Sequence, residues 1–128
     1  YRTEDTLKQA LSDVQALKER YGRIAVHDKG KRYNTDLLEA VELGFLLDLA
    51  EMLVNAALAR KESRGGHARE DYPDRDDTNF MRHSMSYKIL PEKEDPDAPL
   101  GLTGFTADLR LDYKPVVFTR YEPMERKY

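Results

Sequence analysis

The chain has 128 residues, a length that suits a single domain with one modest core. Lys and Arg number 21 against 24 Asp and Glu, so the net charge of −3 lacks the basic excess that a general nucleic-acid binder needs. The chain contains no cysteine, which excludes disulfides, thiolate metal sites, iron–sulfur ligation and a thiol nucleophile. It begins without Met and enters a helical pattern at once, as one piece of a longer protein would.

Two stretches are expected to be long helices. Apolar side chains recur every three or four residues between 6 and 21, with Thr3 as the N-cap. The stretch 36–63 follows a cap at Asn34 or Thr35, and its apolar residues cover more than one face, which is typical of a central helix. Acidic side chains inside it argue against direct membrane insertion, because each would be costly in hydrocarbon. They are Glu39, Glu42, Asp48 and Glu51.

The second helix is expected to stop near Ser63 or Arg64, because the two glycines that follow can adopt the left-handed conformation that closes a helix. Its last turn would then carry Arg60, Lys61 and Arg64, whose charges complement the negative end of the helix dipole. Farther along, a cap at Asp76 or Asp77 predicts a short third helix through 78–82.

The rest of the chain changes character. Alternating patterns in 83–90 and 106–118 predict two antiparallel strands, and the stretch 91–104, rich in proline and glycine, predicts the connector between them. The expected fold is therefore mainly α. It is a three-helix bundle-like domain with one long central helix, followed by a small two-stranded antiparallel β element. We expect one domain over 1–128, with a helical part at about 1–83 and a β part and tail at about 84–128.

The stretch "RKESRGGHAREDYPDRDD", residues 60–77, holds eleven charged side chains and leaves several uses open. His67 with Glu70, Asp71, Asp74 and Asp76 could ligate a metal, although the arginines among them are natural counter-ions. The histidines and serines permit acid–base or hydrolytic chemistry, and the glycine pair permits an anion site, but no spacing favours either. An ordered ion-pair network covered by another surface is favoured, because exposed pairs contribute little.

A resemblance narrows these alternatives. The segment "ARKESRGGHAREDYPDRDDTNFMRHSMSY" resembles the signature segment in the C-terminal region of the succinate dehydrogenase and fumarate reductase flavoprotein subunits. The flanking "TEDTLKQAL", "NTDLLEAVELGFLLDLAEMLVNAALARKESRG" and "LDYKPVVFTRYEPMERKY" also resemble that family, so essentially the whole chain is covered. L-aspartate oxidase shares part of the signature, but the long ending favours succinate dehydrogenase. The residues of the E-S-R-G-x-H-x-R-x-D-x-P-x-R-D-D core are Glu62, Ser63, Arg64, Gly65, His67, Arg69, Asp71, Pro73, Arg75, Asp76 and Asp77.

The resemblance implies a parent flavoprotein that oxidises succinate to fumarate and holds FAD covalently on a histidine. Electrons would pass to an iron–sulfur subunit and then to quinone at membrane anchor subunits. The parent would be cytoplasmic and peripheral on the inner face of the bacterial plasma membrane, or lie on the mitochondrial matrix side. The upstream domain would bind FAD, so this chain is expected to hold no cofactor, metal or catalytic residue. It would pack on the flavin-binding domain.

Two roles for the charged residues remain open. They could dock the domain on the flavin domain and support flavin attachment, or part of the loop could reach the flavin or substrate region and contribute electrostatics directly. The alternative prediction, which goes with the second role, is that the chain is the same domain of a fumarate reductase or L-aspartate oxidase flavoprotein. The candidate docking residues are Arg64, His67, Arg69, Asp71, Arg75, Asp76, Arg82, His83 and Arg126.

Overall fold

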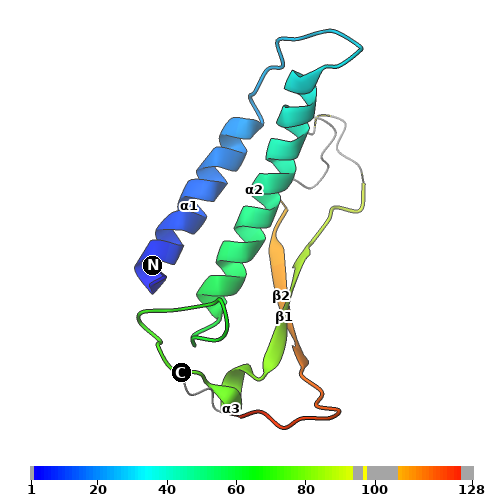
Figure 1. Cartoon of the computed structure of the whole chain (residues 1–128). Coiled ribbons are helices and arrows are strands. Elements are labelled where there is room, and N and C mark those ends of the chain that lie inside the picture. The colour runs from blue at the N-terminus through cyan, green and yellow to red at the C-terminus, as the bar shows by residue number, and fades with distance from the viewer. Residues whose placement is uncertain (1, 94–96, 98–106, 125–128) are drawn as a thin grey trace.

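The computed structural model describes residues 2–93, 97 and 107–124. Its elements in chain order are α1 (Glu4–Tyr21), α2 (Thr35–Ala59), α3 (Asp77–Phe80), β1 (Arg82–Lys88) and β2 (Leu109–Pro115). Helices α1 and α2 run antiparallel, and α2 lies between α1 and the two-stranded ribbon of β1 and β2 (Figure 1). The mainly helical fold with a small antiparallel β element is confirmed.

Both predicted N-caps of the long helices are confirmed. The Thr3 side chain accepts a hydrogen bond from the Thr6 backbone, and the Thr6 side chain accepts one from the Thr3 backbone, so a threonine closes this capping box. At the start of α2, the Asn34 side chain accepts from the Leu37 backbone at 2.9 Å. The short third helix also has its predicted cap, because Asp76 accepts from the Asn79 backbone at 2.9 Å.

The predicted end of the second helix was wrong. Helix α2 ends at Ala59, and Arg60 already has extended backbone angles, four residues before the predicted stop at Ser63 or Arg64. No basic residue lies in the last helical turn, so the predicted stabilisation of the helix dipole by that turn is also wrong. Gly65 does have a positive φ of 58°, but it serves a separate turn in which Arg64 and His67 exchange two backbone hydrogen bonds.

The ribbon forms with Arg82 opposite Pro115 and Lys88 opposite Leu109. The strands lie inside the predicted stretches 83–90 and 106–118, apart from Arg82, which the prediction assigned to the third helix. Most of the predicted connector 91–104 lies outside the described residues. One face of β1 carries Ser84 and Lys88 and contacts α2, since Arg60 donates to the Ser84 hydroxyl and Lys88 pairs with Asp48. The ribbon is thus fastened to α2 by polar contacts.

Charged side chains also lie between the two long helices. Lys18 of α1 is almost fully buried and pairs with Glu51 at 2.5 Å and Asp48 at 3.0 Å, both from α2. Asp48 in turn accepts from Lys88 of β1 at 2.8 Å. This ionic seam of Lys18, Asp48, Glu51 and Lys88 joins all three layers. Near it the Tyr21 hydroxyl donates to the Ala40 carbonyl at 2.8 Å.

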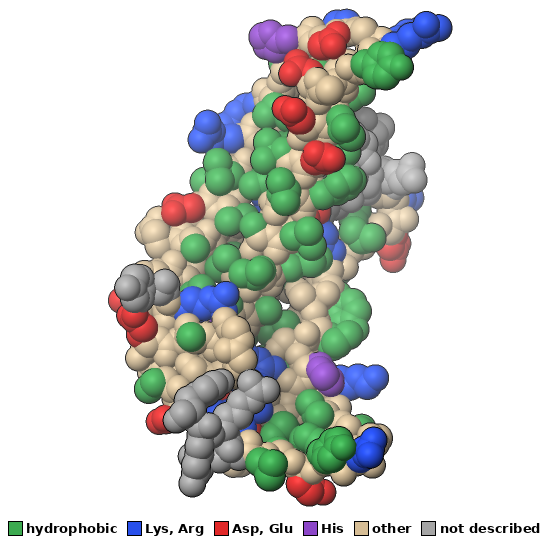
Figure 2. All heavy atoms as spheres, in the orientation of Figure 1, with side chains coloured by type: hydrophobic (Ala, Val, Ile, Leu, Met, Phe, Trp, Pro, Cys, Tyr) green, Lys and Arg blue, Asp and Glu red, His purple; other side chains and the backbone are tan. Residues whose placement is uncertain are grey.

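The opposite side of α2 remains uncovered. Five large apolar side chains there are 52–63% exposed, and at 3.6 residues per turn they share one side of the helix. Figure 2 shows hydrophobic side chains gathered along α2 on the face toward the viewer. We call this set the apolar face of α2. Its members are Leu38, Phe45, Leu46, Leu49 and Leu53. Among the described residues, no helix combines enough length with enough apolar character to cross a membrane.

Candidate functional site

Arg69 and Asp71 link the ends of the two long helices. The Arg69 side chain is fully buried, and its Nη1 donates to the carbonyls of Ala57 and Leu58 in the last turn of α2, each at 3.2 Å. Its Nε and Nη2 donate to the two carboxylate oxygens of Asp71 at 2.7 and 2.6 Å. The same carboxylate accepts from the Glu4 backbone, in the first turn of α1, at 2.8 Å. We call this arrangement the Arg69–Asp71 clamp.

The clamp suits the electrostatics of both helix ends. A guanidinium at the carbonyl end of α2 and a carboxylate at the N–H end of α1 each complement a helix dipole. Hydrogen bonds from Arg69 hold the pKa of Asp71 far below its usual range. The sequence identified Arg69 and Asp71 as candidates, but only the fold shows that Arg69 donates to the carbonyl end of α2, twelve residues upstream.

His67 lies beside the clamp as a neutral imidazole. Its Nδ1 is 2.9 Å from Nη1 of Arg2, which can only donate, so Nδ1 accepts and Nε2 carries the proton donated to the Arg60 carbonyl at 3.1 Å. Burial lowers the pKa of His67, and the nearby charges of Arg2, Arg69 and Arg60 lower it further. His67 therefore bridges the N-terminal segment and the residue that ends α2.

Glu62 is the centre of a second cluster. It is 0% exposed and accepts from the side chains of Arg60 and Arg64 and from the Asp76 backbone. Burial raises the pKa of Glu62, but the hydrogen bonds from Arg64, Asp76 and Arg60 outweigh it, and the pKa lies below the ordinary value. Because Arg60 also donates to the carbonyls of Phe80 and Arg82, the cluster fixes α3 and the start of β1 to the end of α2.

The remaining candidates lie nearer the surface. Arg75 pairs with Asp77 at 2.9 Å and donates to the Met124 carbonyl at 3.2 Å. Asp76 acts as the cap of α3. Arg82 stacks on the ring of Tyr113, and the neighbouring His83 is exposed on the other face of β1. Arg126 lies outside the described residues.

The structure thus separates the predicted docking residues into two groups. It brings Arg69, Asp71 and His67 together at the helix ends, and it places Arg64, Asp76 and Arg82 around Glu62 and α3. Glu62 and Arg60 are not among the docking residues predicted from the sequence, although both are in the signature stretch. A glutamate between two arginines was the available signal, but total burial of its carboxylate depends on α3 folding over it.

Metal and hydrolytic uses find no support in this arrangement. Within the described ranges, no group of three or more His, Asp or Glu side chains is placed to hold a metal ion. The Ser63 hydroxyl donates to the Tyr72 carbonyl at 2.8 Å and accepts from the Arg69 backbone at 2.8 Å, so it serves the loop. Ser84 accepts from Arg60. Neither serine contacts a histidine as a hydrolytic nucleophile does.

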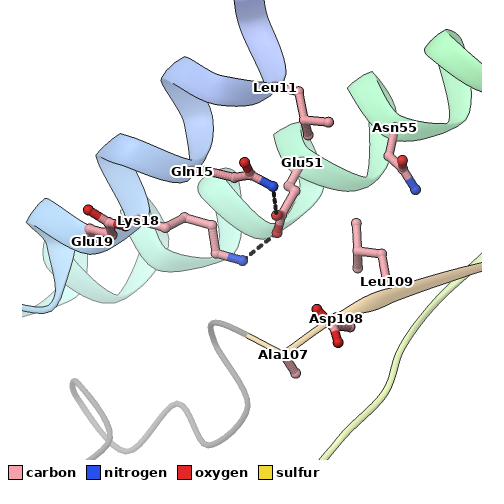
Figure 3. A pocket seen from close by; sticks show the side chains of 9 residues that line it. All are labelled: Leu11, Gln15, Lys18, Glu19, Glu51, Asn55, Ala107, Asp108 and Leu109. Atoms are coloured by element: carbon pink, nitrogen blue, oxygen red, sulfur yellow. Dashed lines mark hydrogen bonds and ion pairs between the residues drawn. The ribbon is translucent and has the colours of Figure 1, made fainter. Parts of the chain in front are cut away.

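The sequence signature of a dinucleotide cofactor site is also missing. The sequence has no G-x-G-x-x-G fingerprint to receive a pyrophosphate. A cavity of about 370 Å³ lies between α1, α2 and the start of β2. Figure 3 shows Lys18 and Gln15 reaching from α1 toward Glu51 of α2, with Leu109 across the space. Since Lys18 is already neutralised by Glu51, the described residues that line this cavity offer no free phosphate-binding cation.

Comparison with known proteins gives the family. The family model described as fumarate reductase flavoprotein C-term matches residues 1–128. The chain is 39% identical over all 128 residues to a fumarate reductase flavoprotein subunit of Haemophilus influenzae, of which it covers 19%. It is 40% identical over 119 residues to a succinate dehydrogenase flavoprotein subunit of Rickettsia conorii, covering 93% of this chain and 17% of that protein.

Solved structures agree with the sequence relatives. The E. coli quinol fumarate reductase FrdA superposes with a TM-score of 0.80 at 35% identity, over 98% of this chain and 19% of that one. Mycobacterium smegmatis Sdh1 superposes with a TM-score of 0.72 at 29% identity, over 93% of this chain and 18% of that one. The chain therefore spans about a fifth of the length of the relatives that it matches. By sequence and by fold, it belongs to the C-terminal domain family of the fumarate reductase and succinate dehydrogenase flavoprotein subunits.

Proposed function

We propose that this chain is the structural and docking domain at the C-terminal end of a flavoprotein subunit that interconverts succinate and fumarate. The upstream part of the subunit binds FAD and carries the chemistry, and this domain packs on it without catalysing the reaction alone. The observation that carries the proposal is the apolar face of α2. Five large apolar side chains, each more than half exposed, form a contiguous patch of the kind that marks an interaction surface.

The charged residues support this surface from the inside. The Arg69–Asp71 clamp and the Glu62 cluster fix the end of α2 against α1, α3 and β1, so that the apolar face is held in one orientation. Arg69 therefore contributes to docking through the shape of the domain, because its donors are already occupied within the chain. Among the candidates, Asp71, Arg75 and His83 are exposed and can contact another part of the parent directly, and Arg82 is half-buried.

The direction of the parent reaction has two candidates. The long C-terminal ending favours a succinate dehydrogenase, as predicted from the sequence. A fumarate reductase is the alternative, supported by the match over all 128 residues to the Haemophilus protein and by the higher TM-score of FrdA. Steady-state rates of the full-length enzyme in both directions separate the two, since a succinate dehydrogenase oxidises succinate with quinone faster than it reduces fumarate with quinol.

The proposed partners follow from the family. The domain contacts the flavin-binding domain of its own subunit, and the subunit assembles with an iron–sulfur subunit and membrane anchor subunits. The parent is a peripheral protein on the inner face of the bacterial plasma membrane or on the matrix side of the mitochondrial membrane. Solved relatives that include a quinol-fumarate reductase with menaquinol molecules support a role in a quinone-linked complex.

The experiment introduces a charge on the apolar face of the full-length subunit. Leu49→Asp is expected to lower covalent flavin content and co-purification of the iron–sulfur subunit, because an unpaired carboxylate is placed in the interface. Tyr33→Asp is the matched control, since Tyr33 is 99% exposed in a loop with a positive φ that Asp tolerates. Equal flavin content and assembly in the two variants contradict the proposal.

A second test uses the 128-residue chain on its own. The purified chain is expected to show no flavin absorbance and no oxidation of succinate, because the residues described above include no flavin-binding fingerprint. FAD that co-purifies with the chain would contradict the assignment of all flavin contacts to the upstream part. The measurement is an absorption spectrum, with a dye-linked succinate assay on the same sample.

A further inference from the structure

A basic cavity lies where α2 ends, α3 turns and β1 begins. Its volume is about 390 Å³, and its lining residues come from the end of α2, from α3 and from the start of β1. Figure 1 shows these segments at the same end of the domain. Three arginines line it from three different segments. The side chains that matter here are Arg60, Arg64, His67, Phe80, Arg82 and His83. We call this cavity the arginine pocket.

Two of the three arginines already have anionic partners. Arg60 pairs with the buried carboxylate of Glu62 and donates to two backbone carbonyls. Arg64 pairs with Glu62 through Nε and with Asp77 through Nη2 at 2.6 Å. Asp77 is itself shared with Arg75. Of the three guanidinium groups in the pocket, two therefore pair with Glu62 or Asp77, and one positive charge has no carboxylate partner among the described residues.

That charge is on Arg82. Its guanidinium carbon lies 3.6 Å from the centre of the Tyr113 ring and 5.3 Å from that of Phe80, so aromatic rings contact the guanidinium group. Its Nε is buried and has no hydrogen-bond partner in the part of the chain that is described. No hydrogen bond from its two terminal nitrogens is found among those residues either. Stacking orients the group and leaves its two terminal nitrogens to donate, and this pair of nitrogens matches a planar carboxylate.

We propose that Arg82 binds the carboxylate of an Asp or Glu side chain in the upstream, flavin-binding part of the parent subunit. The proposal rests on the proposed function and extends it from an apolar contact to one specific ion pair. The occupant is assigned to the upstream part because the chain spans only 19% of the length of its relatives, so most of the subunit lies outside it. A carboxylate there completes the charge balance of the pocket and satisfies a stacked, oriented guanidinium.

The test uses the full-length subunit and two arginines of the ribbon that each stack on a tyrosine ring. Arg82→Gln removes the charge at the pocket, and Arg110→Gln removes a charge from the outer face of β2, where Arg110 stacks on Tyr87 and is 59% exposed. Hydrogen exchange is followed in peptides covering 80–90. Breaking a buried charge pair is expected to speed exchange in Arg82→Gln by about thirtyfold or more, with little change in Arg110→Gln. Equal exchange in both variants overturns the proposal.

A charge swap separates an ion pair from a loss of local packing. Arg82→Glu is combined in turn with single Asp→Arg or Glu→Arg substitutions in the upstream part. One of these is expected to restore slow exchange and covalent flavin content to Arg82→Glu while impairing the subunit when present alone. If no upstream substitution restores slow exchange in peptides 80–90, the proposal is overturned. It is also overturned if millimolar succinate gives the same slow exchange in a subunit from which the part before Tyr1 has been removed, because the occupant is then not an upstream side chain.

Failure of this proposal can be told from failure of the proposed function. If Leu49→Asp weakens flavin attachment and assembly but Arg82→Gln matches Arg110→Gln, the domain docks through α2 and the ion pair is absent. If Leu49→Asp also has no effect, docking itself is refuted, and the ion pair fails with it.

Discussion

Replacing Arg69 with methionine tests whether the charged loop holds the domain together. Methionine keeps much of the length and apolar surface of the side chain but removes every donor. The wild-type side chain makes four hydrogen bonds, two to Asp71 and one each to the carbonyls of Ala57 and Leu58. Arg69→Met therefore opens the end of α2 and also releases the carboxylate that caps the start of α1.

The expected size follows from burial. Removing one partner of a buried, hydrogen-bonded charge pair typically costs 3–5 kcal/mol, and we place Arg69→Met at about 3 kcal/mol because Asp71 is partly exposed and regains water. Arg75→Met is the matched control. Arg75 pairs with Asp77 at a similar distance, but both side chains are substantially exposed, so water replaces the lost contact.

Hydrogen exchange in the full-length subunit measures the effect locally. Peptides that cover the last two turns of α2 are expected to exchange about 150-fold faster in Arg69→Met, the factor that corresponds to about 3 kcal/mol of local opening free energy. The same peptides are expected to be nearly unchanged in Arg75→Met. Equal protection in the two variants would refute the clamp, because a surface pair would then matter as much as the buried one.

Four further substitutions test the interior with the same exchange measurement. Lys18→Met is expected to destabilise the α1–α2 contact by about 3 kcal/mol, because the buried carboxylate of Glu51 loses its cation. Adding Glu51→Leu should recover part of that loss, and a strictly additive double variant would contradict the ionic seam. Tyr21→Phe should lower the free energy of unfolding by about 1 kcal/mol, because the hydrogen bond from the hydroxyl to the Ala40 carbonyl is lost. No change would show that water replaces this hydrogen bond. The pKa of His67 is lowered from its ordinary value of 6.5, so the unfolded state takes up a proton before the folded state does as the pH falls. The contribution of His67 to the free energy of unfolding is therefore complete above pH 6.5 and declines below it. His67→Gln should flatten this pH dependence between about pH 7.5 and about pH 5.

Local signals predicted the elements well. The caps Thr3, Asn34 and Asp76 each act through backbone groups two or three residues away, so the sequence alone contains the whole interaction. The alternation in the two strands likewise reflects a local period. The family resemblance rested on residue types in a fixed order, which also needs no tertiary information.

The end of α2 and the ionic seam could not be predicted in this way. Helix α2 stops at Ala59 because Arg69 supplies donors to its last carbonyls and Arg60 turns away toward α3 and β1, and both effects depend on distant segments. At 3.6 residues per turn Lys18 lies between Leu7 and Leu11 on the buried side of the first helix, where a lysine is unexpected. It is accommodated there because Glu51 and Asp48 of α2 pair with it, and Asp48 also pairs with Lys88 of β1. Tertiary pairing, and not local propensity, decided these positions.

The most direct test of docking is the solvent exposure of the apolar face in the intact subunit. Hydroxyl-radical footprinting of the full-length protein should label Phe45 slowly, although its side chain is 52% exposed in this domain, because the upstream part covers it. Tyr33, in the loop before α2, serves as the exposed reference. Slow labelling of Phe45 beside fast labelling of Tyr33 is the predicted result. Labelling of Phe45 at the rate expected for a half-exposed phenylalanine would contradict the account.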